Sequence, residues 1–385
     1  MVDATVNSTA ALLDTAIPED EPAGPNVRLP LHAKPAASLS PIGYFPDQIK
    51  HAYNFDQLPC TSLNTCGQGQ TIAIIDAYDN SNVEKDLAIF SKEFGLPIMP
   101  NCESKKDVGC FQKLYVSGKK PLFDELWALE ISLDVQWAHA IAPGAKILLV
   151  ESQDATIGSL MKAVDKAISK GADQISMSWG TAEFPEELTY DHHFHKKNIL
   201  FFASSGDGGA GSQYPSSSPN VVSVGGTTLT LDYDGSVLSE VAWAASGGGT
   251  SLFEKVPNYQ KQFGVNANGM RSIPDVSYHA DLENGFPVYD SSGYFGDFGW
   301  FIVGGTSAGP PQWAALAAIA NSDSNSLIHN NKVFYKAALG SRYAVNYKDI
   351  VSGSNGSYIA GPGYDRVTGL GTPVANNLVQ FLRTN

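Results

Sequence analysis

One serine has the surroundings that a nucleophile needs. Ser307 lies in Gly304-Gly-Thr-Ser307-Ala-Gly-Pro-Pro, where glycines precede the hydroxyl and two prolines suit the first turn of a helix. A helix N-terminus favours developing negative charge because its free N–H groups carry partial positive charge. The pattern therefore indicates a nucleophilic serine. The alternative is that Ser307 only caps the helix.

A nucleophilic serine needs a base, and the chain offers two kinds. Glu130 and Asp134 stand four residues apart in an apolar helix pattern, so they share one face and can touch. A coupled, partly buried carboxyl pair has a raised upper pKa and can act as acid or base at low pH. One alternative is a solvated helix face. Another is a histidine base, such as His139 with Asp76, although no histidine stands in a segment typical of that use.

The elements that must position these groups alternate along the chain. Continuous apolar strands separated by helices predict a largely parallel central sheet with helices on both faces, an α/β fold. The expected strands are 71–75, 146–150, 174–178, 199–203 and 221–224, and the expected helices are 83–94, 122–140, 157–170, 188–196 and 312–321. Residues 225–300, rich in Gly, Ser and aromatic side chains, are expected to form loops and short strands.

Composition limits the class of protein. Of the 385 residues, 43% are hydrophobic and 17% charged, with a formal net charge of −14, which excludes global disorder. An acidic chain without a Lys/Arg block is a poor partner for nucleic acid. No apolar run reaches the roughly 20 residues that span a bilayer. We expect an N-terminal tail or processed remnant over residues 1–45 and a single domain over 46–385.

The four cysteines form two close pairs, Cys60 with Cys66 and Cys102 with Cys110. Their spacings fit no zinc pattern, so the favoured interpretation is two disulfides and an oxidising compartment. The alternative is four unrelated buried thiols. The start of the chain lacks the charged and apolar regions of a secretory signal, so an export signal is either absent from this chain or not used.

Four motifs in order resemble the sedolisin family, serine-carboxyl peptidases with a subtilisin-like fold. The motifs are Gly67-Gln-Gly-Gln-Thr-Ile-Ala-Ile-Ile-Asp76, then Glu130-Ile-Ser-Leu-Asp134, then Ser176-Met-Ser-Trp-Gly180 with Ala203-Ser-Ser-Gly-Asp207, and last the segment around Ser307. The resemblance covers nearly all of residues 48–380. Each motif alone is modest, and their joint occurrence in order is specific.

The resemblance implies a role for each matched residue. Ser307 would be the nucleophile, Glu130 the general base, and Asp134 the acid that orients Glu130 and shares its proton. Asp207 would be protonated and donate to the oxyanion of the tetrahedral intermediate. Asp76 would extend the chain of acids, and Trp179 would line the site.

The C-terminal part resembles the family's calcium site. The carboxylates of Asp349 and Asp365 and the carbonyl oxygens of Ile350, Gly361 and Gly363 would give five ligands to one Ca²⁺, and a water a sixth. The resemblance thus implies a subtilisin-like α/β domain with a C-terminal calcium loop. The alternative is a Gly/Pro surface loop with stray acids.

The expected function is that of an acid-acting serine-carboxyl endopeptidase that works through an acyl-enzyme. Alternatives are a tripeptidyl-peptidase of the same family, a subtilisin-type His-triad protease, and a calcium-dependent binding protein without activity. Expected partners are protein or peptide substrates, bound by a monomer in an extracellular or other acidic, oxidising compartment. The family carries a large pro-domain, so we expect either a mature chain from which it was removed or a member without one.

Overall fold

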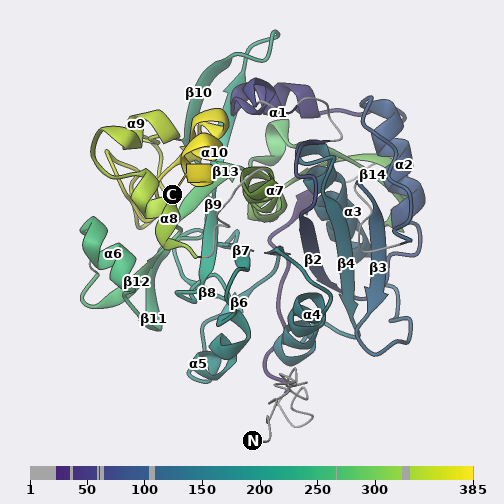
Figure 1. Cartoon of the computed structure of the whole chain (residues 1–385), viewed down its shortest axis with the longest axis horizontal. Coiled ribbons are helices and arrows are strands. Elements are labelled where there is room, and N and C mark those ends of the chain that lie inside the picture. The colour runs from purple at the N-terminus through teal and green to yellow at the C-terminus, as the bar shows by residue number, and fades with distance from the viewer. Residues whose placement is uncertain are drawn as a thin grey trace, which may run out of the picture.

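The central sheet is built from the apolar strands that the sequence predicts. A computed structural model describes residues 23–34, 38–58, 60, 65–103, 109–265, 267–322 and 330–384. Within these residues the main sheet has eight strands, in the order β10-β9-β7-β5-β2-β4-β3, with β13 paired to β9 (Figure 1). All pairs are parallel except β10 with β9. The strands are β2 Thr71–Ala77, β3 Phe111–Tyr115, β4 Lys146–Ser152, β5 Gln174–Met177, β7 Leu200–Ser204, β9 Val221–Leu231, β10 Val237–Ala242 and β13 Val276–His279.

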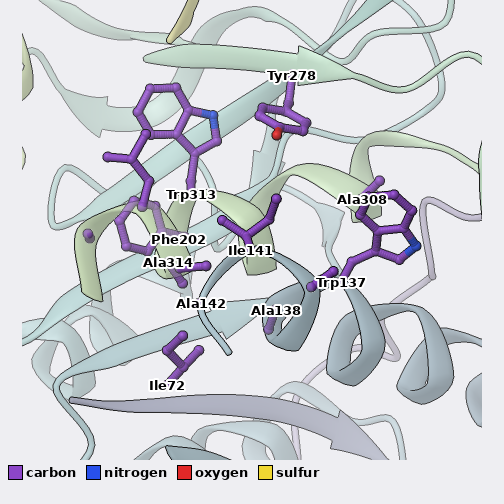
Figure 2. Packing of buried hydrophobic residues seen from close by; sticks show 14 of the residues in the cluster. Ile72, Trp137, Ala138, Ile141, Ala142, Phe202, Tyr278, Ala308, Trp313 and Ala314 are labelled. Carbon is purple, nitrogen blue, oxygen red and sulfur yellow. The ribbon is translucent and has the colours of Figure 1, made fainter. Parts of the chain in front are cut away.

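Helices cover both faces of this sheet, as expected. On one face α3 contacts α2 and α7, and α10 packs on α7; α4 packs against β2 and β4 and contributes to a separate apolar cluster. Figure 2 shows Trp137 and Ala138 of α3 and Trp313 and Ala314 of α7 in the same part of the core. The helices are α1 Pro46–Ala52, α2 Val83–Glu93, α3 Glu125–Ile141, α4 Ile157–Ser169, α5 Glu187–Tyr190, α6 Asn258–Phe263, α7 Gly309–Ser322, α8 Lys332–Ala337, α9 Tyr343–Asn346 and α10 Ala375–Thr384.

The region expected to be mostly loops contains more strand than the sequence pattern indicated. Strand β9 continues to Leu231, and β14 Phe286–Tyr294 pairs with β15 Asp297–Gly304 as a long antiparallel hairpin. The register of this hairpin shifts between Asp290 and Tyr294. That irregularity falls on a run of Ser and Gly residues, so the alternation of apolar and polar residues that marks a strand is interrupted there. The short pairs are β6 Thr181–Ala182 with β8 Gln213–Tyr214, β11 Gly249–Lys255 with β12 Met270–Ile273, and β16 Tyr347–Lys348 with β17 Thr372–Pro373.

The described residues upstream of α1 pair with strands of the domain. We expected a tail or processed remnant there, and residues 1–22 and 35–37 lie outside the described residues. Strand β1 His32–Ala33 pairs antiparallel with the end of β15, and Arg28 forms an isolated bridge with Gly180. In Figure 1 this purple segment runs past α4 through the middle of the molecule toward α1.

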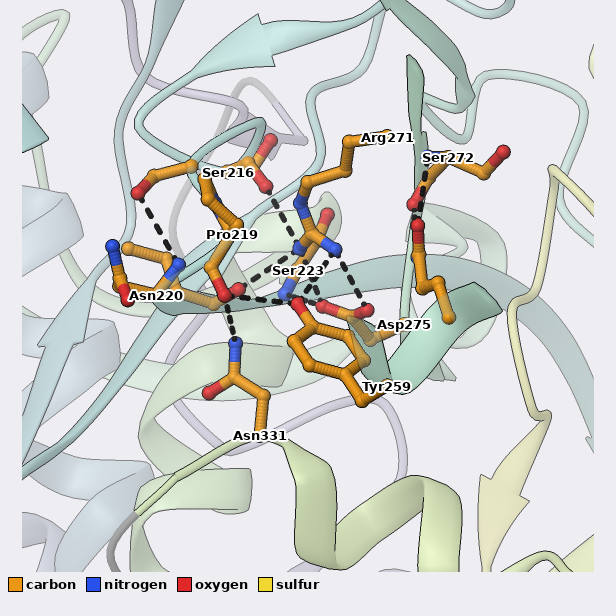
Figure 3. A network of polar contacts seen from close by, with 12 residues as sticks. Ser216, Pro219, Asn220, Ser223, Tyr259, Arg271, Ser272, Asp275 and Asn331 are labelled. Atoms are coloured by element: carbon orange, nitrogen blue, oxygen red, sulfur yellow. Dashed lines mark hydrogen bonds and ion pairs between the residues drawn. The ribbon is translucent and has the colours of Figure 1, made fainter. Parts of the chain in front are cut away.

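A buried ion pair joins β12 and β9 to the start of β13. The Arg271 guanidinium donates to both oxygens of Asp275 at 3.1 and 2.7 Å, and both side chains are almost completely buried (Figure 3). Asp275 also accepts the N–H of Ser223 in β9 at 2.9 Å. Because both charges are desolvated, removing one partner would leave the other buried and unpaired. The pair therefore holds the start of β13 beside β9.

The cysteine pairing is confirmed. Cys60 is bonded to Cys66 and Cys102 to Cys110, which excludes the alternative of four free thiols. Among the helices within the described residues, none is both long enough and apolar enough to cross a membrane.

Candidate active site

The structure brings Ser307 and Glu130 into contact. Ser307 lies in a 3-10 turn, Thr306–Ala308, which leads directly into α7, as the Gly/Pro pattern predicts. Its Oγ donates to Glu130 Oε2 at 3.1 Å, although the two residues are 177 positions apart in the sequence. Glu130 is on α3, which packs against α7. Hydroxyl and carboxylate are thus within the reach required for proton transfer.

Three acidic side chains lie together in the dry interior beside Ser307. Asp76, Glu130 and Asp134 are each 0% exposed. Burial, followed by the negative charges of Asp134 and Asp76, raises the pKa of Glu130 well above its usual value. Burial and the charge of Asp134 raise the pKa of Asp76, and burial raises that of Asp134. Asp76, expected only as a possible extension, therefore belongs electrostatically to the same group.

Several oxygens of these buried acids have no hydrogen-bond partner. Neither oxygen of Asp76 has a hydrogen-bond partner among the described residues, and Glu130 Oε1 and Asp134 Oδ2 also lack one. A buried carboxylate without a donor is costly, whereas a carboxyl that shares a proton with its neighbour is satisfied. We conclude that the group carries protons at a pH where exposed acids are ionised.

Asp207 is held next to the serine by the residue that precedes it. The Thr306 N–H and hydroxyl both donate to Asp207 Oδ1, at 2.9 and 2.7 Å. The other carboxyl oxygen, Asp207 Oδ2, forms an ion pair with His32, whose Nε2 lies 3.1 Å away. Burial raises the pKa of Asp207 even though His32 and Thr306 act to lower it. Since both donors use Oδ1, a proton on this carboxyl would sit on Oδ2.

Gly305 is required between these groups. Its φ is +117°, which side chains rarely adopt, and a Cβ there would lie 2.6 Å from Asp207 Oδ2 and 2.1 Å from the Pro30 carbonyl oxygen. Both oxygens therefore border the space that a Cβ would fill. The Pro30 oxygen also accepts the backbone N–H of Ser307 at 3.2 Å. Asp207 Oδ2 and the Pro30 oxygen, which accepts the Ser307 N–H, thus both lie beside Gly305.

Sequence reasoning assigned no role to two further residues of the site. Ser178 Oγ donates to Asp134 Oδ1 at 2.9 Å and also lies 3.1 Å from the Ser307 carbonyl oxygen. Thr306 holds Asp207, as described above. Both lie within motifs that carry the family resemblance, so the sequence could have pointed to them. His32 had no such signal, because it comes from a segment expected to be a tail.

Trp179 does not expose its ring. It is 0% exposed, and its indole N–H donates to the Ile75 carbonyl at 2.7 Å. This bond joins the end of β2, just before Asp76, to the turn after β5. Trp179 therefore fixes the backbone beside the acids and does not line an open surface of the site.

The histidine alternative finds no support in the geometry. His139 is completely buried, and its Nε2 lies 2.8 Å from the Pro97 carbonyl oxygen. Desolvation lowers its pKa to about 4. His139 stands nine residues after Glu130 on α3, which places it about 13 Å farther along the helix axis. The structure therefore does not bring His139 to Ser307.

The predicted calcium loop has a donor set that suits the ion. Asp349 Oδ2 accepts the Gly363 N–H at 2.9 Å, and Asp365 Oδ2 accepts the Gly361 N–H at 3.2 Å, so both carboxylates lie at the same turn. Among the described residues no hydrogen bond reaches the carbonyl oxygens of Ile350, Gly361 and Gly363. Ca²⁺ prefers carbonyl and carboxylate oxygens. The carboxylates already accept other hydrogen bonds as well: Asp349 Oδ1 from the Tyr343 hydroxyl at 2.9 Å, and Asp365 Oδ1 from the N–H groups of Val367 and Thr368 at 2.7 and 2.8 Å. Within the described residues no group of three or more His, Cys, Asp or Glu side chains could hold a metal, and this loop offers two.

Comparisons with known proteins give the family of this chain. The Subtilase family model matches residues 129–356, which includes Glu130, Asp134, Asp207 and Ser307. The solved structure of Pseudomonas sedolisin, a serine-carboxyl proteinase complexed with two molecules of pseudo-iodotyrostatin, superposes with a TM-score of 0.75 at 26% identity, over 90% of this chain and 99% of that one. The chain belongs to the sedolisin family of subtilases.

Curated relatives of this sedolisin-family chain include kumamolisin and tripeptidyl-peptidase 1. It is 29% identical to kumamolisin of Bacillus sp. (strain MN-32) over 90% of its own length and 64% of kumamolisin. It is 25% identical to tripeptidyl-peptidase 1 of Canis lupus familiaris over 86% of its own length and 63% of that protein. The chain thus spans less than two thirds of the length of these curated relatives.

Proposed function

We propose that this chain is an acid-acting serine-carboxyl endopeptidase that hydrolyses peptide bonds through an acyl-enzyme on Ser307. The observation that carries the proposal is the 3.1 Å hydrogen bond from Ser307 Oγ to Glu130 Oε2, made where Glu130 is completely buried and flanked by further acids. Membership of the sedolisin family supports the reaction class.

The proposed reaction assigns a task to each of the catalytic groups. Glu130 takes the proton of Ser307 as its Oγ attacks the scissile carbonyl carbon, and Asp134 holds Glu130 in place through a shared proton. The oxyanion accepts from the Ser307 N–H and from protonated Asp207 Oδ2. Glu130 then gives its proton to the leaving amine, and water hydrolyses the acyl-enzyme by the same steps in reverse order.

The same geometry explains why the reaction would run in acid. Asp207 can donate a hydrogen bond only while it is protonated, and burial raises its pKa. Activity should therefore fall as the pH rises through the folded-state pKa of Asp207. The raised pKa values of Glu130, Asp134 and Asp76 let this group keep a shared proton over the same acidic range.

The test is a pH–rate profile on a mixed peptide library, with cleavage sites read by mass spectrometry. We expect an optimum well below pH 7, and turnover nearly abolished in Ser307→Ala and in Glu130→Ala. His139→Ala is the matched control, since it replaces the other candidate base, and it should retain the pH profile of the unmodified chain. An optimum above pH 8, or normal turnover in Ser307→Ala, would refute the proposal.

Removal of tripeptides from free N-termini is the second candidate, and similarity to tripeptidyl-peptidase 1 favours it. It uses the same chemistry and differs only in where the cleft ends. Peptides with blocked and free N-termini separate the two activities. Equal cleavage of both supports the endopeptidase, whereas cleavage of the free form alone supports the exopeptidase.

We further propose that the loop of Asp349 and Asp365 holds one Ca²⁺, with the carbonyl oxygens of Ile350, Gly361 and Gly363 as the other protein ligands. The ion would supply charge compensation for two carboxylates at one turn and would tie residues 349–350 to 361–365. Its part would be structural, since these residues lie outside the Ser307 site. Together with the two disulfides, such a site fits an extracellular or other acidic, oxidising compartment.

A further inference from the structure

The base and the nucleophile of the proposed reaction belong to separate elements, and a third element joins those two. Glu130 is on α3, and Ser307 follows strand β15, which ends at Gly304. Strand β14 pairs with β15 along its length and also contacts α3. The position of β14 against α3 is therefore one of two constraints on the distance from Glu130 to Ser307. The other is the packing of α3 on α7.

Strand β14 has one side without a neighbouring strand. In the three-stranded sheet the order is β1-β15-β14, so β14 stands at the edge. Its residue Tyr289 lies opposite Trp300 of β15. The N–H and carbonyl groups on the edge of a strand need partners wherever water does not reach them. At Tyr289 those partners come from α3.

Gln136 of α3 supplies both partners from one side chain. Its Nε2 donates to the Tyr289 carbonyl oxygen at 2.7 Å, and its Oε1 accepts the Tyr289 N–H at 3.0 Å. The amide thus takes the place of a residue in a neighbouring strand. Gln136 is 0% exposed. The next residue along the helix, Trp137, donates its indole N–H to the Pro287 carbonyl oxygen at 3.1 Å, so α3 is bonded to β14 at two adjacent positions.

These bonds place α3 where Glu130 can reach Ser307. Gln136 comes six residues after Glu130, which is about 9 Å farther along the helix axis. From Tyr289, the paired strands lead to the turn that contains Ser307, with only Gly305 between the end of β15 and that turn. Loss of the amide would leave two backbone groups of β14 without partners, so β14 would move relative to α3. A displacement of about 1 Å at the reacting atoms can cost about 100-fold in rate.

We propose that Gln136 is a positioning residue of the peptidase reaction: its amide holds β14 against α3 and so keeps Ser307 at hydrogen-bonding distance from Glu130. The inference rests on the proposed function, because it concerns the transfer of a proton from Ser307 to Glu130. Gln136 acts through the backbone of β14 and has no part in the proton transfer itself.

The chain contains a matched control for this residue. Gln260 of α6 is also 0% exposed and makes the same pair of bonds with Ser272 of β12. Its Nε2 donates to the Ser272 carbonyl oxygen at 2.7 Å, and its Oε1 accepts the Ser272 N–H at 3.1 Å; it also donates to the Tyr335 hydroxyl. In Figure 1, α6 and β12 lie on the opposite side of the molecule from α3. Loss of this amide should therefore lower stability without changing the contact of Ser307 with Glu130.

The first test removes the amide and keeps the length of the side chain. With an internally quenched peptide at the acid optimum, we expect kcat of Gln136→Met to fall about 10- to 100-fold. KM should not change, because Gln136 is buried and no substrate reaches it. Gln260→Met should lower the Tm by a similar amount and keep the kcat of the unmodified chain. All rates are measured well below the Tm of each variant, so equal kcat values for the two would overturn the inference.

The second test uses Gln136→Glu and the pH. A protonated carboxyl can donate to the Tyr289 carbonyl oxygen and accept its N–H as the amide does, whereas a carboxylate cannot donate. Because burial favours the neutral form of a carboxyl, this variant should match the unmodified chain in acid. As the pH rises, the ratio of its kcat to that of the unmodified chain should fall about tenfold or more. The same ratio for Gln260→Glu should stay constant. A constant ratio for Gln136→Glu, or an equal decline in both variants, would contradict the positioning role.

Ser307→Ala separates a failure of this inference from a failure of the proposed function. If Ser307→Ala hydrolyses the peptide as fast as the unmodified chain, the proposed function fails and the inference fails with it. If Ser307→Ala is inactive while both Gln136 variants keep the kcat of their Gln260 counterparts, the proposed function stands and the positioning role alone is wrong. Should Gln136→Met not fold, the pH series of Gln136→Glu is sufficient, since that variant keeps both bonds in acid.

Discussion

Replacing Asp207 gives the sharpest test of the oxyanion assignment, because Asn and Ala should behave differently. Asp207 Oδ1 accepts both donors of Thr306, so an Asn side chain can keep these bonds and direct its amide N–H where Oδ2 stands. Ala removes the donor altogether. The amide donates at every pH, whereas the carboxyl donates only when protonated.

The size of each effect follows from the loss of one oxyanion donor. Such a loss costs about 100- to 1000-fold in kcat, or roughly 2.7–4 kcal/mol. We expect Asp207→Ala to fall by that factor at the pH optimum. Asp207→Asn should stay within about tenfold of the unmodified chain there. As the pH rises, the unmodified chain loses about tenfold per unit above the pKa of Asp207, and Asp207→Asn should not show that loss.

The assay is kcat/KM for a quenched peptide from about pH 2 to 8, taken after the rate in acid has become constant. Thermal melting of each variant shows whether the fold is retained. If Asp207→Asn loses activity along the same alkaline limb as the unmodified chain, or if Asp207→Ala retains a third of its kcat, Asp207 is not the oxyanion donor.

Three further predictions concern stability and the backbone at the site. Because burial raises the pKa of Asp76, Glu130 and Asp134, the folded chain binds more protons than the unfolded chain above about pH 4, so the free energy of unfolding should decrease as the pH rises through that window. Melting curves from about pH 3 to 8 should show a lower Tm at the alkaline end and a flatter dependence in Glu130→Gln; maximal stability at pH 8–9 would contradict the shared-proton group. Gly305→Ala should lose at least 100-fold in kcat, because the added Cβ would enter the space beside Asp207 Oδ2. The control is Gly296→Ala, which also has a positive φ but has nothing within 4 Å of its added Cβ, and it should keep full activity. Equal rates for the two variants would show that the reaction does not use this space. Chelation should lower the Tm of the unmodified chain, and added Ca²⁺ should restore it. Asp365→Asn should have a low Tm from the start, and neither the chelator nor Ca²⁺ should change it. If the chelator still lowers the Tm of Asp365→Asn, the ion binds elsewhere.

The fold was predictable where burial alone decides the structure. Strand β2 reads as an unbroken apolar run, and it is buried in the centre of the sheet. The start of α3 was wrong by three residues because Leu122 and Phe123 extend the apolar pattern, yet they are 76% and 53% exposed. The helix begins where Asp124 Oδ1 accepts the N–H groups of Leu126 and Trp127, both at 3.1 Å. Capping, not hydrophobicity, sets that boundary.

The site was predictable to the extent that it is encoded in contiguous motifs. The motifs named both Ser307 and Glu130, and the structure places them in contact, although no local pattern fixes a distance between two helices. Their catalytic roles stay predictions. His32 could not be found in this way. It reaches Asp207 only because β1 pairs with a strand about 270 residues later, and the alternation that marks a strand is absent from so short a segment.

The packing of α3 on α7 has a consequence for how activity is lost. Glu130 and Ser307 sit on opposite sides of one helix–helix contact, and small residues such as Ala138, Ala308 and Ala314 line the core around it (Figure 2). Opening of this interface would therefore separate the nucleophile, in the turn that leads into α7, from its base on α3. Heat inactivation and global unfolding should follow a single cooperative transition, so the half-life of the enzyme at high temperature is a measure of core integrity.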